Sequence, residues 1–308
     1  MDVPLDAQNV GVHRPRPTLR PGSRPDDPRR VAGLRPRARR FPRAPRVAEA
    51  QHGGARAPRA PHDDSPRRGA RGGRGVHGLA GVHVGEAPGH IRDTRAALEQ
   101  SGIGAALRGD RLPFADLNYE DAAWRRNRGR HSALPGFYFP QSVVQADYVV
   151  SLPKLKTHHW VGLTASMKNF YGVLPGIKYG WPKNVLHHNG IPETVVDINR
   201  TLPRTLGIVD AVDCMEGDGP ILGSPKHMGL ILVGANLAAL DATCARIMHL
   251  EPARVSYLQL AEGSLGPLDE RLIEQRGEPW RNVASPFQLL QQEHLQRLRS
   301  EFNADLVT

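Results

Sequence analysis

The sequence predicts an α/β fold, with a mainly parallel sheet flanked by helices and preceded by a disordered segment rich in Arg and Pro. Three observations support this prediction. Three short apolar runs, residues 146–152, 206–209 and 229–234, have the length and composition of buried strands. Segments with helical spacing accompany these runs, as in sheets whose strands are connected by helices. Residues 1–80 have a composition unlike that of the rest of the chain.

The first 80 residues contain 18 arginines and no lysine against seven acidic residues, in a chain whose net charge is +10. Their single aromatic residue is Phe41. Such a segment cannot bury enough apolar surface to offset the entropy of ordering it. We therefore expect two parts: a disordered basic segment, residues 1–80, and an α/β domain, residues 81–308.

The origin of this basic segment has several explanations. An arginine-rich arm can neutralise phosphates, but the absence of lysine and of interleaved aromatic residues makes nucleic acid an unfavoured partner. A targeting segment needs an apolar stretch after its twin arginines, and none follows them. Arg, Pro, Gly and Ala have the most GC-rich codons, so out-of-frame translation of a GC-rich gene gives this composition. We favour this last explanation over a plain disordered tail.

The ordered part is expected to begin with the end of a strand at 79–84 and a Gly- and Pro-containing turn at 85–89. A helix at 94–107 would be interrupted at Gly102 and Gly104. The strand at 146–152 is β-branched and apolar, and the proline that follows it ends it.

The second half of the chain begins with the strand at 206–209, which is followed by the strand at 229–234. Asn236 is a suitable N-cap for a helix at 237–250, and a short helical segment follows at 255–262. Ser285 and the proline after it have the pattern that opens a final helix.

Half of the chain's six lysines lie within fifteen residues, directly after the strand at 146–152. Ligands of α/β sheets bind beyond the carboxyl ends of strands, so this basic loop is a candidate site for a small carboxylate or phosphate. A solvated basic face is the alternative. In the site hypothesis Lys154, Lys156 and Lys168 hold the anion, His158 transfers protons and Asn169 orients the ligand.

The loop after the strand at 206–209 is acidic and glycine-rich. Its carboxylates can bind a divalent cation or act as acid and base, although their spacing does not match an EF-hand. A turn whose aspartates cap backbone amides is the alternative. The candidate roles are catalysis for Asp210 and Glu216, cation binding for Asp213 and Asp218, and close approach of the backbone to a ligand for Gly217 and Gly219.

Two histidine pairs fall in the middle of the chain, at 158–159 and 187–188, without the i, i+4 spacing of a helical zinc site. His187 is a candidate ligand-binding residue. Cys214 and Cys244 do not form a CxxC motif, so this chain alone cannot supply an iron–sulfur cluster.

The motifs at 151–158, 167–172, 209–210 and 215–220, in this order and spacing, resemble the family called domain of unknown function 362, over roughly residues 82–280. The resemblance implies that Glu86, in the earlier turn, belongs to the same site. It also implies redox chemistry, since some relatives carry a ferredoxin module, and hence a ferredoxin-like partner here. The family's domain begins earlier, so this chain is expected to lack an N-terminal strand and helix, which favours the out-of-frame explanation.

Two main hypotheses follow. The first is an enzyme that acts on a small anionic molecule. The second is a non-catalytic cofactor-binding or redox-accessory module that works with an iron–sulfur partner, and nucleic-acid binding by residues 1–80 is a third. No apolar run is long enough to span a membrane, and nothing signals export. The expected compartment is the cytoplasm.

Overall fold

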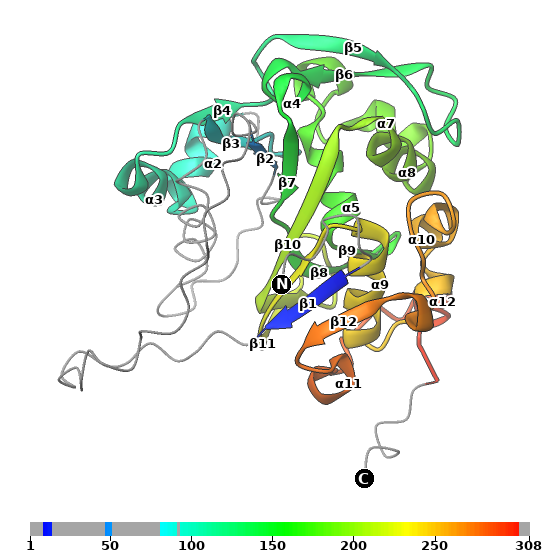
Figure 1. Cartoon of the computed structure of the whole chain (residues 1–308). Coiled ribbons are helices and arrows are strands. Elements are labelled where there is room, and N and C mark those ends of the chain that lie inside the picture. The colour runs from blue at the N-terminus through cyan, green and yellow to red at the C-terminus, as the bar shows by residue number, and fades with distance from the viewer. Residues whose placement is uncertain (1–8, 14–46, 51–80, 91–92, 302–308) are drawn as a thin grey trace, which may run out of the picture.

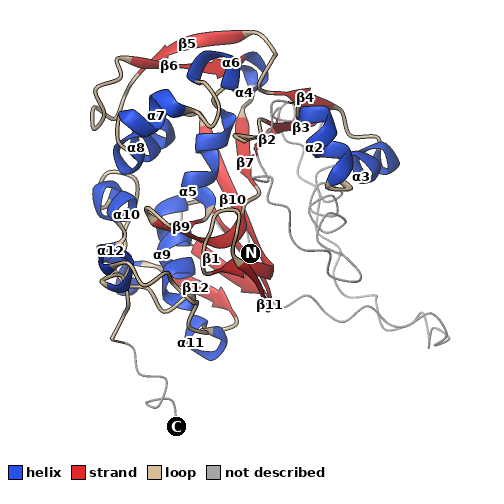
Figure 2. Ribbon diagram, turned by 180° about the vertical axis from the view of Figure 1, so that it is seen from behind, coloured by secondary structure: helices blue, strands red, loops and turns tan. Residues whose placement is uncertain are grey.

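The computed structural model describes residues 9–13, 47–50, 81–90 and 93–301, and it confirms an α/β fold. A ten-stranded sheet runs through the molecule with β10 at its centre (Figure 1). Helices α5, α8 and α9 lie along one side of β10, and α2 and α3 lie beside β3 and β4 (Figure 2). A separate two-stranded sheet, β5–β6, lies at one end.

The main path of the large sheet has the order β12-β1-β11-β10-β7-β2-β3-β4, and β8 and β9 continue from β10. The strands of both sheets are β1 (Asn9–His13), β2 (Val47–Ala50), β3 (Val82–Glu86), β4 (Phe114–Asp116), β5 (Ala122–Arg126), β6 (Gly136–Pro140), β7 (Tyr148–Ser151), β8 (Lys154–His158), β9 (Gly162–Thr164), β10 (Arg204–Glu216), β11 (Ser224–Gly234) and β12 (Glu274–Gly277).

The prediction of a mainly parallel sheet is wrong, because the sheet is mixed. β10 is parallel to β7 and β8 but antiparallel to β11, and β1 is also antiparallel to β11. The physical reason is the short connection at 217–223, which can join only neighbouring strands of opposite direction. The sequence predicts a strand at 206–209 followed by an acidic loop, whereas β10 continues through the acidic residues to Glu216.

Residues 1–80 contribute two described strands to this sheet. β1 pairs with β11 and β12, and β2 lies between β3 and β7, parallel to both. Both β3 and β7 are therefore paired with a strand on each side. The expected disorder elsewhere in residues 1–80 falls outside the described residues.

The helices are mostly short. They are α2 (Thr94–Gln100), α3 (Ile103–Asp110), α4 (Gln141–Gln145), α5 (Ser166–Asn169), α6 (Gly176–Tyr179), α7 (Asn184–His188), α8 (Ile191–Thr201), α9 (Leu237–Ile247), α10 (Ser256–Ala261), α11 (Trp280–Val283) and α12 (Glu293–Gln296), with 3-10 turns η2 (Phe170–Val173), η3 (Pro252–Arg254) and η4 (Glu270–Leu272). Among the described residues, no helix is both long and apolar enough to cross a membrane.

Several predicted helices are confirmed. The expected break in the first helix separates α2 from α3, and Gly102 there has a φ of 76°, which glycine adopts without a steric cost. Asn236 caps α9, since its side chain accepts a hydrogen bond of 3.0 Å from the Ala239 amide. The predicted final helix, opening at Ser285, is wrong: residues 285–291 are not helical, and within the described part of the chain only α12 follows them.

The core lies between the sheet and the helices on its α9 side. Val209 of β10, Leu232 of β11 and Leu240 of α9 are fully buried there. A smaller cluster, Val82, Leu107 and Leu112, joins α3 to the β3 end of the sheet. Leu155 of β8 and Met167 of α5 also belong to the larger cluster, so this core fixes the two elements whose polar side chains form the site described below.

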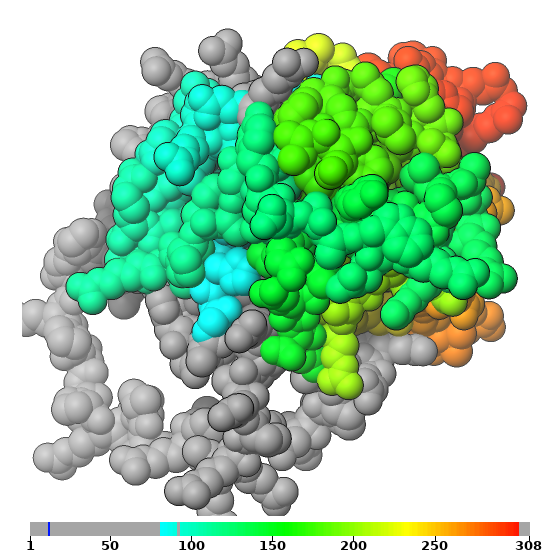
Figure 3. Space-filling view, turned by 90° about the horizontal axis from the view of Figure 1, so that it is seen from above, coloured from blue at the N-terminus to red at the C-terminus, as the bar shows by residue number. Residues whose placement is uncertain are grey.

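A buried carboxylate fixes the β5–β6 hairpin to the body of the protein. Asp197 of α8 accepts hydrogen bonds from the amides of His131 and Ser132 in the hairpin turn, at 2.9 and 2.8 Å, and from the Asn127 side chain at 2.6 Å. Seen from above, the hairpin and the α7–α8 segment accordingly share one face (Figure 3).

Candidate functional site

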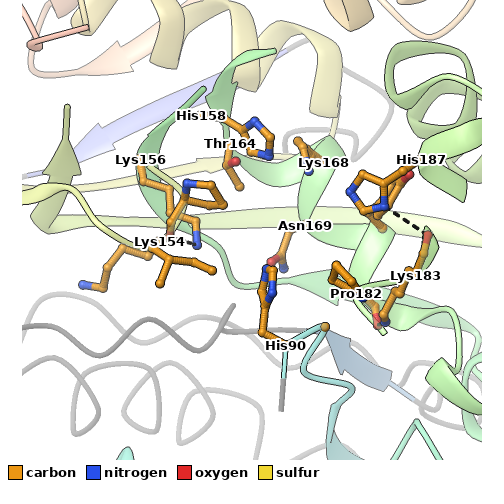
Figure 4. A pocket seen from close by; sticks show the side chains of 15 residues that line it. His90, Lys154, Lys156, His158, Thr164, Lys168, Asn169, Pro182, Lys183 and His187 are labelled. Atoms are coloured by element: carbon orange, nitrogen blue, oxygen red, sulfur yellow. Dashed lines mark hydrogen bonds between the residues drawn. The ribbon is translucent and has the colours of Figure 1, made fainter. Parts of the chain in front are cut away.

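A polar pocket of about 120 Å³ opens beside β8 and α5 (Figure 4). It combines segments far apart in the sequence: the turn after β3, strands β8 and β9, α5, and the loops before α7 and after β10. Among the described residues, four lysines and three histidines contribute to its wall, and no Asp or Glu does. The lining residues are Gly89, His90, Lys154, Lys156, His158, Thr164, Lys168, Asn169, Tyr171, Gly172, Pro182, Lys183, His187, Pro220 and Ile221.

Helix α5 is held in place by Asp241 of α9. The Asp241 carboxylate is fully buried and accepts hydrogen bonds from the amides of Ser166 and Met167, at 2.7 and 3.0 Å, and from the hydroxyl groups of Ser166 and Tyr257. Burial raises the pKa of Asp241 to about 6, and these donors oppose that rise. Through them Asp241 fixes the first turn of the helix that carries Lys168.

Lys168 is the least satisfied cation of the pocket. Its side chain is 9% exposed, and within the described residues its Nζ atom has no hydrogen-bond acceptor. The atom lies 4.8 Å from the centre of the Tyr171 ring. Burial, followed by the charge of Lys156, lowers the pKa of Lys168 to about 7. This amine therefore changes its charge near neutral pH.

The other two lysines of the predicted basic loop lie on strand β8, so that segment is a strand and not a loop. Lys156 is 8% exposed and donates to the Pro220 carbonyl at 3.3 Å. Burial, followed by Lys154, lowers its pKa to about 8, while Glu86 acts in the opposite direction. Lys154 is paired, since it contacts the Asp210 carboxylate at 3.1 Å and the Asp213 carbonyl at 2.7 Å.

Lys183 is a pocket residue that the sequence analysis missed. Its Nζ donates to the carbonyls of Ala87, Gly172 and Leu174, at 3.1, 2.5 and 2.6 Å. Three acceptors match the three protons of an ammonium group. Burial lowers its pKa to about 7, whereas Glu86 raises it. The rarity of lysine could have identified it as a candidate, because the chain has only six lysines.

Two histidines of the pocket have complementary hydrogen-bonding states. His158 Nδ1 accepts from the Trp160 amide at 3.2 Å, so its proton is assigned to Nε2. His187 Nδ1 lies 3.0 Å from the Lys183 carbonyl and must donate to it, so its Nε2 carries the lone pair (Figure 4). Burial, followed by the charge of Lys168, lowers the pKa of His158. Burial also lowers the pKa of His187, while the hydrogen bond to the Lys183 carbonyl acts in the opposite direction. The pocket therefore contains a neutral donor and a neutral acceptor.

His90 and Thr164 are two further lining residues that were not predicted. Burial lowers the pKa of His90, and Lys156 and Lys168 lower it further, which places this ring close to both cations. Thr164 Oγ1 is buried without a partner in the described part of the chain. His90 directly follows the predicted turn at 85–89, but a single His after a turn carries no specific signal.

Asn169 is where the basic-loop prediction places it, in the pocket wall, and its side chain donates to Ser151 Oγ at 3.1 Å. Glu86 ends β3 and interacts electrostatically with Lys156 and Lys183, but it does not line the pocket. Glu86 is thus close enough to Lys156 and Lys183 to affect their pKa values, although it is not a lining residue of the pocket.

The acidic residues lie outside the pocket and are engaged with other groups. Asp210 pairs with Lys154, and Asp213 contacts His227 at 2.7 Å. Glu216 accepts from the Gln288 amide at 3.0 Å and lies 3.5 Å from Lys226. Asp218 lies 3.8 Å from His159. Among the described residues, no three His, Cys, Asp or Glu side chains gather as metal ligands.

The glycines of the acidic segment bring the chain close to β8. A Cβ atom at Gly219 would lie 2.0 Å from the Thr157 carbonyl oxygen, and Gly217 has a φ of 80°. The Gly217 carbonyl accepts from the Thr157 hydroxyl at 3.0 Å. These glycines thus let the backbone approach strand β8 and not a ligand. The residues that follow them, Pro220 and Ile221, lie in the pocket wall.

Comparison with known families defines the class of protein. The family model described as "Domain of unknown function (DUF362)" matches residues 74–246, more than half of the chain, and the chain belongs to this family. The match confirms the resemblance drawn from the sequence motifs, and it covers all the described pocket residues.

One curated relative is the thylakoid-associated protein sll1697 of Synechocystis sp. (strain ATCC 27184 / PCC 6803 / Kazusa). It is 27% identical to this chain over 181 residues, which are 58% of this chain and 54% of the relative. The chain thus aligns with about half the length of that relative.

Proposed function

We propose that the protein is an enzyme that binds a small molecule through a carboxylate or phosphate group in the Lys and His pocket. The observation that carries this proposal is Lys168, whose nearly buried amine has no hydrogen-bond acceptor among the described residues. A buried cation without a partner is costly. An anionic ligand removes this cost, and the described residues of the wall include no carboxylate that would repel it.

The ligand's anionic group is held by Lys156 and Lys168, with His158 Nε2–H as a neutral donor. Asn169 and Thr164 supply polar contacts beside α5. His187 Nε2 is the proton acceptor. We leave Asp210 and Glu216 out of the catalytic set because their carboxylates are engaged with Lys154, Lys226 and the Gln288 amide.

Titration calorimetry with inorganic phosphate, sulfate and acetate tests this proposal. Lys156→Met and Lys168→Met should each weaken binding by at least about tenfold, because a hydrogen bond to a charged group contributes about 1.5–3 kcal/mol. Lys178→Met is the matched control, since Lys178 is exposed on α6 and lies over the Tyr138 ring. Unchanged affinity in the Lys168 variant, or no binding of any of the three anions, would contradict the proposal.

The enzyme and the non-catalytic module differ in turnover. An enzyme consumes carboxylate- or phosphate-bearing substrates and loses turnover in His187→Gln. A cofactor-binding module keeps Lys168-dependent anion binding but turns over none of these substrates.

The cytoplasmic location stays a prediction. Since the relative is named thylakoid-associated, cell fractionation should include the membrane pellet.

A further inference from the structure

We propose that Lys168 is an imine-forming lysine and that the pocket takes an aldehyde or ketone that also carries a carboxylate or phosphate group. This inference rests on the anion site proposed above and names its substrate class. For a substrate that carries both groups, it assigns the anionic group to Lys156, the carbonyl oxygen to His158 Nε2–H and the reacting carbonyl carbon to Lys168 Nζ.

The lysines of the pocket differ in how their amines are satisfied. Lys183 uses its three protons on three carbonyls, and Lys154 is paired with Asp210. Lys156 contacts the Pro220 carbonyl. Lys168 alone among these four has neither a hydrogen-bond acceptor nor an ion pair within the described residues, so its amine is free to react.

The charge state of this amine also matters. A lysine becomes a nucleophile when a desolvated pocket and a neighbouring cation favour the neutral form. Lys168 has both: it is nine-tenths buried, and Lys156 is the cation that lowers its pKa after burial. The Tyr171 ring beside it, at 4.8 Å, covers the amine without accepting its proton.

The pocket also supplies proton-transfer groups. The Lys168 lone pair forms the N–C bond while the carbonyl π electrons move to oxygen, which receives a hydrogen bond from His158 Nε2–H. His187 Nε2 accepts a proton from the nitrogen, and that proton reaches the oxygen. The resulting carbinolamine loses its hydroxyl group and its remaining N–H proton as water, leaving the C=N bond. No oxidant or reductant takes part.

Borohydride trapping tests the inference. The full-length protein is incubated with glyoxylate or pyruvate and sodium cyanoborohydride, which reduces the imine to a stable amine, and modified peptides are mapped by mass spectrometry. Lys168 should be modified at least about tenfold faster than Lys178, because a lower pKa leaves more neutral amine at pH 7. Phosphate should compete, and acetaldehyde, which has no anionic group, should react more slowly.

The variants separate this inference from the proposal on which it rests. The Lys168→Met variant should form no adduct at this position. The Lys156→Met variant should still form the adduct at Lys168, but at a higher glyoxylate concentration. If phosphate binds through Lys156 and no adduct forms at Lys168, the imine is overturned and the anion site stands. If neither phosphate nor glyoxylate binds, both are overturned. Equal labelling of Lys168 and Lys178 also overturns the imine.

Discussion

The basic segment, residues 154–172, and the acidic segment, residues 210–220, are both rich in ionisable side chains, yet only the first contributes charged side chains to the pocket wall. Each of the four carboxylates named in the acidic segment lies near a cation or a histidine, as with Asp213 and His227. In the basic segment Lys168 has no such partner within the described residues. Charge density in a sequence therefore says less about function than whether each charge is already satisfied by the fold.

The largest expected effect concerns Lys183, the satisfied counterpart of Lys168. Lys183→Met should lower the free energy of unfolding by about 3–9 kcal/mol, because three buried carbonyls lose their donor at about 1–3 kcal/mol each. Lys168→Met should lower it by less than about 1 kcal/mol or raise it, since it removes an unpaired buried charge.

Urea denaturation of both variants measures this difference. Lys178→Met, on the surface of α6, is the control and should stay within about 0.5 kcal/mol of the native protein. Similar losses for the Lys183 and Lys168 variants would remove the distinction between a satisfied and an unsatisfied cation.

The next largest effect on stability is expected where the acidic segment contacts strand β8 of the basic segment. Gly219→Ala places a Cβ atom 2.0 Å from the Thr157 carbonyl oxygen, so the backbone must shift, at a cost of about 2–3 kcal/mol. Gly217→Ala meets no atom within 4 Å and should cost only about 1 kcal/mol, for its left-handed φ. Thermal unfolding compares the two, and a larger shift for Gly217→Ala would contradict the contact.

A smaller effect is the pH dependence of anion binding. Anions bind the charged amines, and the pKa values of Lys168 and Lys156 are lowered to about 7 and about 8. Affinity is therefore full below these values and lost as pH rises through them, by at least about tenfold between pH 7 and 9. Sulfate is the suitable probe because its own charge is constant over this range.

Calorimetric titrations at pH 6, 7, 8 and 9 provide the measurement. A flat profile would show that neither amine titrates in this range or that neither binds the anion. The Lys156→Met and Lys168→Met variants then identify which amine dominates, since each should remove its own part of the slope.

The smallest effect is in the acidic segment itself. Asp213 and His227 are 51% and 74% exposed, so Asp213→Asn should change the free energy of unfolding by less than about 0.5 kcal/mol. Sulfate affinity should stay within about twofold of the native value. A tenfold loss of affinity would return the acidic segment to the site.

Much of the basic site was predictable from the sequence, because its lysines and His158 follow a recognisable buried strand. The direction of the strands was not, since the acidic residues of β10 conceal a strand that continues to Glu216. Lys183 and His90 were missed because Lys183 lies 25 residues after β8 and His90 lies 64 residues before it, and sequence separation does not show that the fold brings them to one pocket. The acidic candidates were misplaced because sequence shows density of charge but not its partners.

Asp241 has a consequence for the order in which the protein folds. Its carboxylate accepts a hydrogen bond from the amide of Ser166, which lies 75 residues away in the sequence. Forming this hydrogen bond therefore brings together two distant parts of the chain. Until α9 docks, the first turn of α5 has no partner for its amides and Lys168 has no fixed direction. We therefore expect the pocket to form late in folding, and amide exchange at Ser166 and Met167 would report on the docking of α9.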